Sequence, residues 1–310
     1  MNIRFFIGPM SKNVVDSVIE YNKENNRITG FIPSRRQVAM RGGYVNNWST
    51  RTFREYVEDA FVVRDHGGPG QGLNDDDGTT SLLEDCKYLD LLHIDPWKRF
   101  PEYKDGLSKT VELIKMCHKE NKDISYEVGT EEAIRRFEVD EVANLLGDLQ
   151  TQLTKKEFSK IKYCVIQSGT ALNKNNNTGV YNKKRLINMC KVVSSYNILS
   201  KEHNGDYLSP DLIREKFSLG LDAINIAPEF GQLETKTYIE AIKKQKPELL
   251  ENFWEICFSS GKWKKWVSSD FDPYKEKETL INICGHYVFS KKRFSEEIRD
   301  KLDLTDEQIF

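Results

Sequence analysis

Short apolar runs alternate with longer charged stretches along the first 235 residues of the chain. The runs are rich in β-branched and aromatic residues, which favours strands over buried helix segments. Eight such runs occur, at residues 3–8, 28–33, 59–65, 88–95, 124–129, 161–167, 197–202 and 220–227. Strands that alternate with helices form parallel sheets, and eight of them close a barrel. The pattern therefore predicts an α/β fold, a (β/α)8 TIM barrel over residues 1–235.

The stretches between the runs have the apolar spacing of amphipathic helices. One helix is predicted from Lys12 to about Glu24, and others over residues 103–121 and 132–158. Residues 236–310 contain no further apolar run of the strand type. We expect this segment to form a helical C-terminal extension that packs on the barrel.

The composition allows a sizeable core, because 38% of the 310 residues are hydrophobic and 30% are charged. The 46 Lys and Arg residues nearly balance the 48 Asp and Glu residues, so there is no general attraction to nucleic acid or anionic membranes. No apolar stretch approaches the ~18 residues of a membrane helix, and the first residues lack a signal-peptide pattern. Six widely spaced cysteines without a CxxC pair indicate reduced thiols. We expect a cytoplasmic protein without nucleic-acid or membrane partners.

Polar clusters follow the predicted strands at their carboxyl ends. Examples are RDHGGPG at 64–70, HIDPW at 93–97 and KEHNGDY at 201–207. In a (β/α)8 barrel these ends converge and build the active site. Three of the five histidines, His66, His93 and His203, fall in such clusters. Their placement predicts a shared site at the rim of the barrel.

Imidazole and carboxylate groups on separate strands can bind a divalent metal and leave one coordination position open. We predict His66 and His203 as ligands, with Glu127 as the third. The metal is expected to be zinc, with manganese or cobalt as alternatives, and it would polarise a substrate carbonyl and stabilise an enediolate. His93 and Asp95 are two residues apart on one strand and therefore point the same way. Asp95 is predicted to orient the site, whereas His93 is either a fourth ligand or a core histidine.

Several motifs resemble, in the same order, those of a known family. They are RRQVAMRGGY at 35–44, RDHGGPGQ at 64–71, HIDPW at 93–97, YEVGTE at 126–131 and KEHNGDYLSPDLIREKF at 201–217. The family comprises the non-catalytic subunits of class II D-tagatose-1,6-bisphosphate aldolase, together with metal-dependent ketose-phosphate 4-epimerases. The resemblance extends from Phe6 to about Glu234 and implies an aldolase-type barrel.

The resemblance also implies roles for individual residues. In class II aldolases, the Asp–His pair that resembles Asp65–His66 supplies a proton-transfer group followed by a metal ligand. Glu127 and His203 are similar to polar residues at later strand ends of the family. The catalytic residues expected from these motifs are Asp65, Asp95 and Glu127, and the expected metal ligands are His66, His93, Glu127 and His203.

The segment NIAPE at 225–229 is similar to the phosphate-binding stretch of class II aldolases. Backbone N–H groups at Gly205, at Ser168–Gly169 and after Asn225 are therefore expected to hold a phosphate. Residues expected to contact a sugar-phosphate substrate lie at the strand ends: Arg35, Gln37, Asn46, Ser168, Gly169, Asn204, Gly205, Asp206, Asn225 and Glu229.

Two functions of different classes remain open. A metal-dependent enzyme of this type would deprotonate a hydroxyl of a phosphorylated ketose and cleave a carbon–carbon bond. An aldolase then releases the aldehyde, whereas a 4-epimerase rotates it and recloses the bond. The alternative is a non-catalytic subunit that stabilises a catalytic aldolase subunit. We favour the enzyme, because a scaffold has no physical need for histidines and a glutamate at one rim. The expected partner besides the sugar phosphate is a second copy of the chain or a catalytic aldolase subunit.

Overall fold

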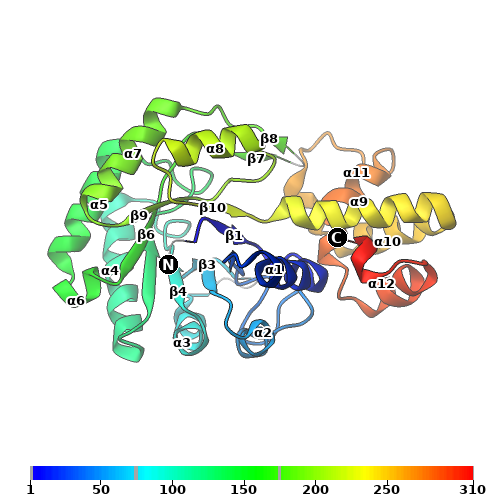
Figure 1. Ribbon diagram of the computed structural model, residues 1–310, viewed down its shortest axis with the longest axis horizontal. Helices are drawn as coiled ribbons and strands as arrows, with labels where there is room; N and C mark the ends of the chain where they lie inside the picture. Colours follow the sequence, from blue (N-terminus) through cyan, green and yellow to red (C-terminus); the bar gives the residue numbers. More distant parts are fainter. Residues whose placement is uncertain (1–2, 73–75, 174–175, 310) are drawn as a thin grey trace.

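The computed structural model describes residues 3–72, 76–173 and 176–309, with a barrel on one side and helices on the other (Figure 1). The barrel strands are β1 (Phe5–Ile7), β2 (Gly30–Phe31), β3 (Val63–Gly67), β4 (Leu91–Ile94), β5 (Ser125–Val128), β6 (Ile161–Val165), β9 (Leu199–Glu202) and β10 (Ala223–Ile226). They pair in parallel in the order β2-β1-β10-β9-β6-β5-β4-β3. Bridges from Phe31 to Val62 and from Ser34 to Asp65 join the two edges and close the ring. Seven of these strands lie within the predicted runs and β3 extends two residues beyond its run, so the predicted TIM barrel is confirmed.

Helices surround the barrel between successive strands (Figure 1). They are α1 (Lys12–Asn25), α2 (Thr50–Val57), α3 (Thr79–Tyr88), α4 (Tyr103–Glu120), α5 (Val139–Gln152), α6 (Lys155–Phe158), α7 (Lys183–Ser195) and α8 (Pro210–Ser218). α1 starts where the sequence predicts it, because Ser11 caps it by accepting a hydrogen bond from the backbone N–H of Val14.

The helix predicted over residues 132–158 is shorter and divided. Gln167 holds the preceding loop in a non-helical path: its amide nitrogen donates to the carbonyls of Thr130 and Arg135, and its oxygen accepts from the backbone of Phe137. A capping box at Glu138 then starts α5, and a second one at Thr154 starts α6. The prediction was wrong here because helical periodicity does not show hydrogen bonds from a distant strand end.

The inside of the barrel is apolar at the amino-terminal side and polar towards the carboxyl ends. The apolar layer consists of Ile3, Phe6, Ile32, Val63, Leu91, Tyr163 and Ala223. Because side chains alternate along a strand, the residues two positions further on also point inwards. On β4 this residue is His93, and on β9 the inward positions are Lys201 and then His203. All three side chains are buried.

The barrel carries two additions. A short antiparallel hairpin, β7 (Leu172–Asn173) and β8 (Asn176–Asn177), follows β6 in the chain and was not predicted. The second addition is the helical extension, with an apolar core of its own between residues 238 and 309. It contains α9 (Pro228–Gln245), α10 (Leu249–Ser260), η1 (Lys262–Trp266), α11 (Lys277–Cys284), η2 (Gly285–Tyr287), α12 (Lys292–Glu297), η3 (Arg299–Lys301) and α13 (Asp306–Ile309).

The long helix α9 connects the two parts. It begins directly after β10 and runs through residue 235, where the sequence predicts the boundary of the extension. It lies beside α1 (Figure 1), and Glu234 accepts hydrogen bonds from Ser11 and Asn13 of that region. Within the described part of the chain, no helix is long and apolar enough to span a membrane.

Candidate metal centre

Three histidines from separate strand ends converge at the carboxyl-terminal side of the barrel. His66 belongs to β3, His93 to β4, and His203 follows β9. The ring centroids of His66 lie 5.1 Å from those of both partners, and those of His93 and His203 are 4.8 Å apart. One nitrogen of each ring lies within 4.8 Å of those of the other two. The predicted ligands His66 and His203 are thus brought together, and His93 joins them.

A bulge in β3 lets two consecutive side chains reach this site. The pairing of β3 with β4 shifts between Arg64 and Gly67, and His66 has a left-handed φ of 47°. In a regular strand Asp65 and His66 would point to opposite faces, whereas a bulge redirects one of them. The Asp65 carboxylate therefore lies 3.8 Å from His66 Nε2 and 3.7 Å from His203 Nδ1.

Each imidazole has one nitrogen fixed by a neighbour. Asp95 Oδ2 lies 2.6 Å from His66 Nδ1, and Glu127 Oε1 lies 2.5 Å from His203 Nε2. His93 Nε2 donates to the carbonyl of Gly129 at 3.0 Å. The remaining nitrogens, His66 Nε2, His93 Nδ1 and His203 Nδ1, face one another, and each can offer a lone pair to a metal once its ring is neutral. Metal-bound histidines in proteins are usually held in this way through the nitrogen that does not touch the metal.

The chemistry of the free nitrogens fits a metal. His203 Nδ1 is buried and has no hydrogen-bond partner among the described residues. His93 Nδ1 accepts only a 3.2 Å bond from the backbone N–H of His66. Three imidazole nitrogens with one carboxylate beside them resemble the donor set of a catalytic zinc site, which keeps a position open for substrate.

The electrostatics of the three rings differ. Burial opposes the charge on His66, but the carboxylates of Asp65 and Asp95 outweigh it and raise the pKa of His66 to about 10. Burial, helped by the charges of His203 and His66, lowers the pKa of His93 to about 4. Since no metal contributes to these values, they describe the metal-free site. In it, His66 shares a proton with its carboxylates and His93 is neutral.

Glu127 is fully buried and is paired in register with His93 of the neighbouring strand. Its Oε2 accepts from Lys201 at 2.7 Å, and its Oε1 faces His203, so both oxygens are engaged. Although burial opposes ionisation, the charges of Lys201 and His203 keep the pKa of Glu127 far below its usual value. The carboxylate predicted as a third ligand thus contacts the site through His203. Lys201 was missed by the sequence analysis, although a lysine within a buried strand, two residues before a candidate ligand, points to it.

The predicted substrate contacts after β6, Ser168 and Gly169, have structural roles in the loop that follows this strand. The Ser168 hydroxyl donates to Glu202 and receives a 2.7 Å bond from Lys216. Thr170 also donates to Glu202. Glu202 and Lys216 are buried outside the sheet, so the Ser168 side chain points away from the histidines. Gly169, with a φ of 89°, adopts the left-handed turn that this loop requires.

The predicted phosphate-binding stretch is filled by the chain itself. Asp206 Oδ1 accepts from the backbone N–H groups of Ala227 and Glu229 at the start of α9. Glu229 in turn accepts from the backbone of Tyr207, and the N–H of Gly205 bonds to a carbonyl of β10. These donors already have acceptors.

Two amides at this end complete the predicted set. Asn204 donates to the carbonyl of Thr170, whereas Asn225 Oδ1 is buried without a partner among the described residues. Asn225 follows the inward-pointing Ala223 by two positions and therefore faces the interior. A substrate hydroxyl could donate to this oxygen.

The predicted substrate contacts after β2, Arg35, Gln37 and Asn46, bind other parts of the chain. Arg35 binds Asp76 through two nitrogens, each at 2.7 Å. Gln37 is buried and contacts Met10, which follows β1. Asn46 is exposed and its backbone N–H donates to Ser290 of the extension, so it does not join the histidine cluster.

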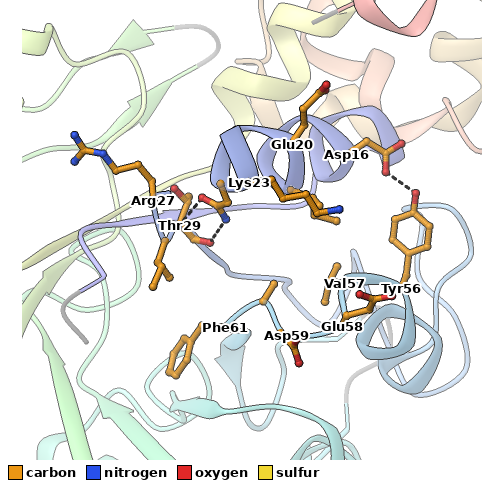
Figure 2. A pocket seen from close by; sticks show the side chains of 14 residues that line it. Asp16, Glu20, Lys23, Arg27, Thr29, Tyr56, Val57, Glu58, Asp59 and Phe61 are labelled. Atoms are coloured by element: carbon orange, nitrogen blue, oxygen red, sulfur yellow. Dashed lines mark hydrogen bonds between the residues drawn. The ribbon is translucent and has the colours of Figure 1, made fainter. Parts of the chain in front are cut away.

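A groove of about 820 Å³ opens elsewhere, between α1 and α2 (Figure 2). Its lining includes Thr29 and Phe61, which precede β2 and β3, so it lies at the amino ends of the strands. Asp16 on its wall is already bonded to Tyr56 and Lys12. Active sites of TIM barrels lie at the opposite, carboxyl-terminal face. The groove is therefore separate from the histidine cluster.

No protein-family model and no curated protein sequence matches the chain. Solved structures share its fold. A crystal structure described as a probable tagatose 6 phosphate kinase from Sinorhizobium meliloti has a TM-score of 0.78 at 15% identity, covering 100% of this chain and 90% of that one. The fructose-bisphosphate aldolase of Campylobacter jejuni has a TM-score of 0.60 at 13% identity, covering 96% and 90%. The fructuronate-tagaturonate epimerase of Cohnella laeviribosi has a TM-score of 0.61 at 9% identity, covering 99% and 76%. These neighbours confirm the barrel fold, whereas membership of the aldolase subunit family that the motifs resemble stays a prediction.

Proposed function

We propose that the protein is a metal-dependent enzyme of the aldolase type that acts on a phosphorylated ketose. The reaction is retro-aldol cleavage, or 4-epimerisation through cleavage of the same bond. The single observation that carries the proposal is the cluster of His66, His93 and His203 with Asp65 beside it. Fold neighbours whose names specify an aldolase and a sugar epimerase support it.

The metal would be held by His66 Nε2, His93 Nδ1 and His203 Nδ1. Zinc suits three imidazole ligands, and manganese or cobalt can occupy the same donors. A divalent metal in this place would supply Lewis-acid polarisation of substrate oxygens. Asp95 and Glu127 position His66 and His203 through the nitrogens that face away from the metal.

Asp65 is the proposed general base. Its carboxylate lies between two of the free nitrogens and is only partly exposed. It takes the proton of the hydroxyl at C4, that oxygen becomes an aldehyde, and the electron pair of the C3–C4 bond passes to the enediolate. In epimerisation the same electron pair attacks the other face of the aldehyde, and Asp65 returns the proton.

The test is Asp65→Asn, which keeps the shape and most hydrogen bonds but removes the basic oxygen. A general base contributes roughly 10²–10⁴-fold, so turnover should fall by that order while folding and metal content stay unchanged. Phosphorylated ketoses are screened with metal supplied, for aldehyde release and for inversion at C4. Turnover that survives the substitution within a few-fold would remove Asp65 from the mechanism.

A second function is favoured by one observation. The N–H groups predicted to bind phosphate are already bonded to Asp206 and to other acceptors of the chain. A non-catalytic subunit that stabilises a class II tagatose-bisphosphate aldolase would need no phosphate site. Absence of turnover with every ketose phosphate, by metal-loaded protein, together with higher activity of a catalytic aldolase subunit on mixing, would support this function instead.

A further inference from the structure

Four cations lie where the extension meets the ends of β2 and β4, close enough that the charges of three of them act on the fourth, Lys265. This patch consists of Arg36 after β2, Lys98 after β4, and Lys262 and Lys265 from η1. Among the described residues, none of these four pairs with a carboxylate, whereas the neighbouring Arg35 is bound by Asp76.

The loop after β3 links this patch to the candidate metal centre. Lys98 donates to the carbonyl of Gly70 at 3.0 Å, and Arg36 donates to the carbonyl of Gly72 at 3.3 Å. Gln71, between them, donates to the Asp95 carboxylate that holds His66. The two cations therefore flank the end of β3, which carries Asp65 and His66.

The extension brings Lys265 to the same place. Lys265 Nζ lies 5.0 Å from the ring centroid of Tyr287, and that ring is 4.8 Å from the ring of Tyr44. The backbone N–H of Tyr44 bonds to the carbonyl of Arg36. Partial desolvation, and then the charges of Arg36, Lys262 and Lys98, lower the pKa of Lys265 to about 8.

The opposite rim offers no comparable place for an anion. At the end of β9 and the start of α9, the carboxylates of Asp206 and Glu229 occupy the backbone donors. The Glu229 carboxylate there would repel a second anion, and the backbone donors beside it are already taken. A substrate with one charged end is thus attracted to the patch and repelled from the α9 end.

We propose that Arg36, Lys98, Lys262 and Lys265 bind the phosphate group of the substrate. A dianionic phosphate suits several cations, and charge-assisted hydrogen bonds to it are about twice as strong as neutral ones. The site requires both the barrel and the extension. This inference rests on the proposed function for its substrate, but the binding itself does not depend on turnover.

The test measures binding of inorganic phosphate to the full metal-loaded chain by calorimetry. Arg36→Gln and Lys265→Gln should each weaken binding by about 10-fold or more, since each removes a charge-assisted contact. The matched control is Lys264→Gln, next to Lys265 on the same short helix, where Lys264 lies 5.9 Å from the Trp263 ring. This control should bind phosphate as tightly as the unmodified chain. Lys265 is exposed apart from its contacts with the rings of Trp266 and Tyr287, so we expect its variant to fold, and this variant decides the test even if Arg36→Gln is unstable.

The possible outcomes separate this site from the proposed reaction. Failure of the unmodified chain to bind phosphate, or equal binding by the Lys265 variant and its control, would overturn the site whatever the turnover. If the chain binds acetate as tightly as phosphate, the site does not select for phosphate. This result would indicate a carboxylate ligand and overturn the inference. A third outcome is that the unmodified chain binds phosphate, both variants lose this binding, and no ketose phosphate is turned over. This outcome would support the phosphate site and contradict only the proposed function.

Discussion

Two buried lysine–glutamate pairs meet on β9, one on each face of the strand. Inside the barrel, Lys201 binds Glu127 at 2.7 Å, and outside it Lys216 binds Glu202 at 2.6 Å. All four side chains are buried, and Lys201 and Glu202 are neighbours in the sequence. Lys201 points into the barrel and Glu202 points out of it, so β9 contributes one residue to a lysine–glutamate pair on each of its faces.

One oxygen of each glutamate binds a lysine, and the two pairs differ in what contacts the other oxygen. Glu127 faces His203, whose other nitrogen is free and buried. Glu202 accepts from Ser168 and Thr170 and so fixes the loop after β6. A buried ion pair is thus no sign of a functional site by itself. The inner pair points to function because its glutamate orients a nitrogen with a free lone pair.

The largest expected effect is on stability and concerns the outer pair. Lys216→Met leaves the Glu202 charge buried and unpaired, which costs roughly 3–5 kcal/mol of unfolding free energy. Urea unfolding measures this loss, and metal content should not change. The matched control is Lys183→Met, since the exposed Lys183–Glu215 pair contributes no more than about 1 kcal/mol. Loss of metal in the folded Lys216 variant would contradict the distinction between the pairs.

The second prediction concerns the inner pair. Glu127→Gln removes the charge that orients His203, and groups in this position contribute roughly 10–100-fold to metal affinity. Affinity for zinc is measured by competition with a chelator. Glu202→Gln is the matched change on the outer face and should leave zinc affinity unaltered. Equal affinity in the two variants would show that Glu127 does not act through His203.

The buried carboxyl of Asp206 differs from both glutamates, because no cation pairs with it in the part of the chain that the structure describes. Burial, and to a lesser degree the charge of Glu229, raise the pKa of Asp206 to about 7, well above the usual range of an aspartate. The folded state thus holds this proton where the unfolded state has released it. Its contribution to stability is therefore full below about pH 4 and is lost as the pH rises to about 7.

Asp206→Asn should remove this dependence, because the amide oxygen can still accept from the start of α9 and carries no charge. We expect the variant to be more stable than the original chain at pH 8 by on the order of 1–2 kcal/mol, with no advantage at pH 4. Thermal unfolding at the two pH values measures the difference. An advantage of the same size at both would contradict a raised pKa.

The sequence was sufficient for the barrel and for the meeting of its histidines. Few folds other than the (β/α)8 barrel accommodate eight apolar runs separated by helical stretches. In this barrel the carboxyl ends of the parallel strands converge. His66 and His203 could be placed at one rim for this reason, without knowledge of side-chain positions. The position of Asp95 beside the histidines also followed, since its spacing of two from His93 put both side chains on the inner face.

Other features depend on contacts between distant residues. The bulge at Asp65–His66 shows in no local pattern, yet it decides that both side chains reach the site. Glu127 was predicted from its strand position, but its engagement by Lys201 depends on the pairing of strands 74 residues apart in sequence. The occupation of the α9 donors by Asp206 depends in the same way on how two loops meet.

Metal content of the purified chain and of its histidine variants tests the central claim most directly. We expect about one equivalent of a divalent metal in the unmodified chain, and in the folded variants His66→Ala, His93→Ala and His203→Ala less than about a tenth of it. His118→Ala, on α4, is the control and should keep the full equivalent. A full equivalent retained by the folded His66 and His203 variants, or no divalent metal in the unmodified chain after incubation with zinc, would contradict a metal centre at this rim.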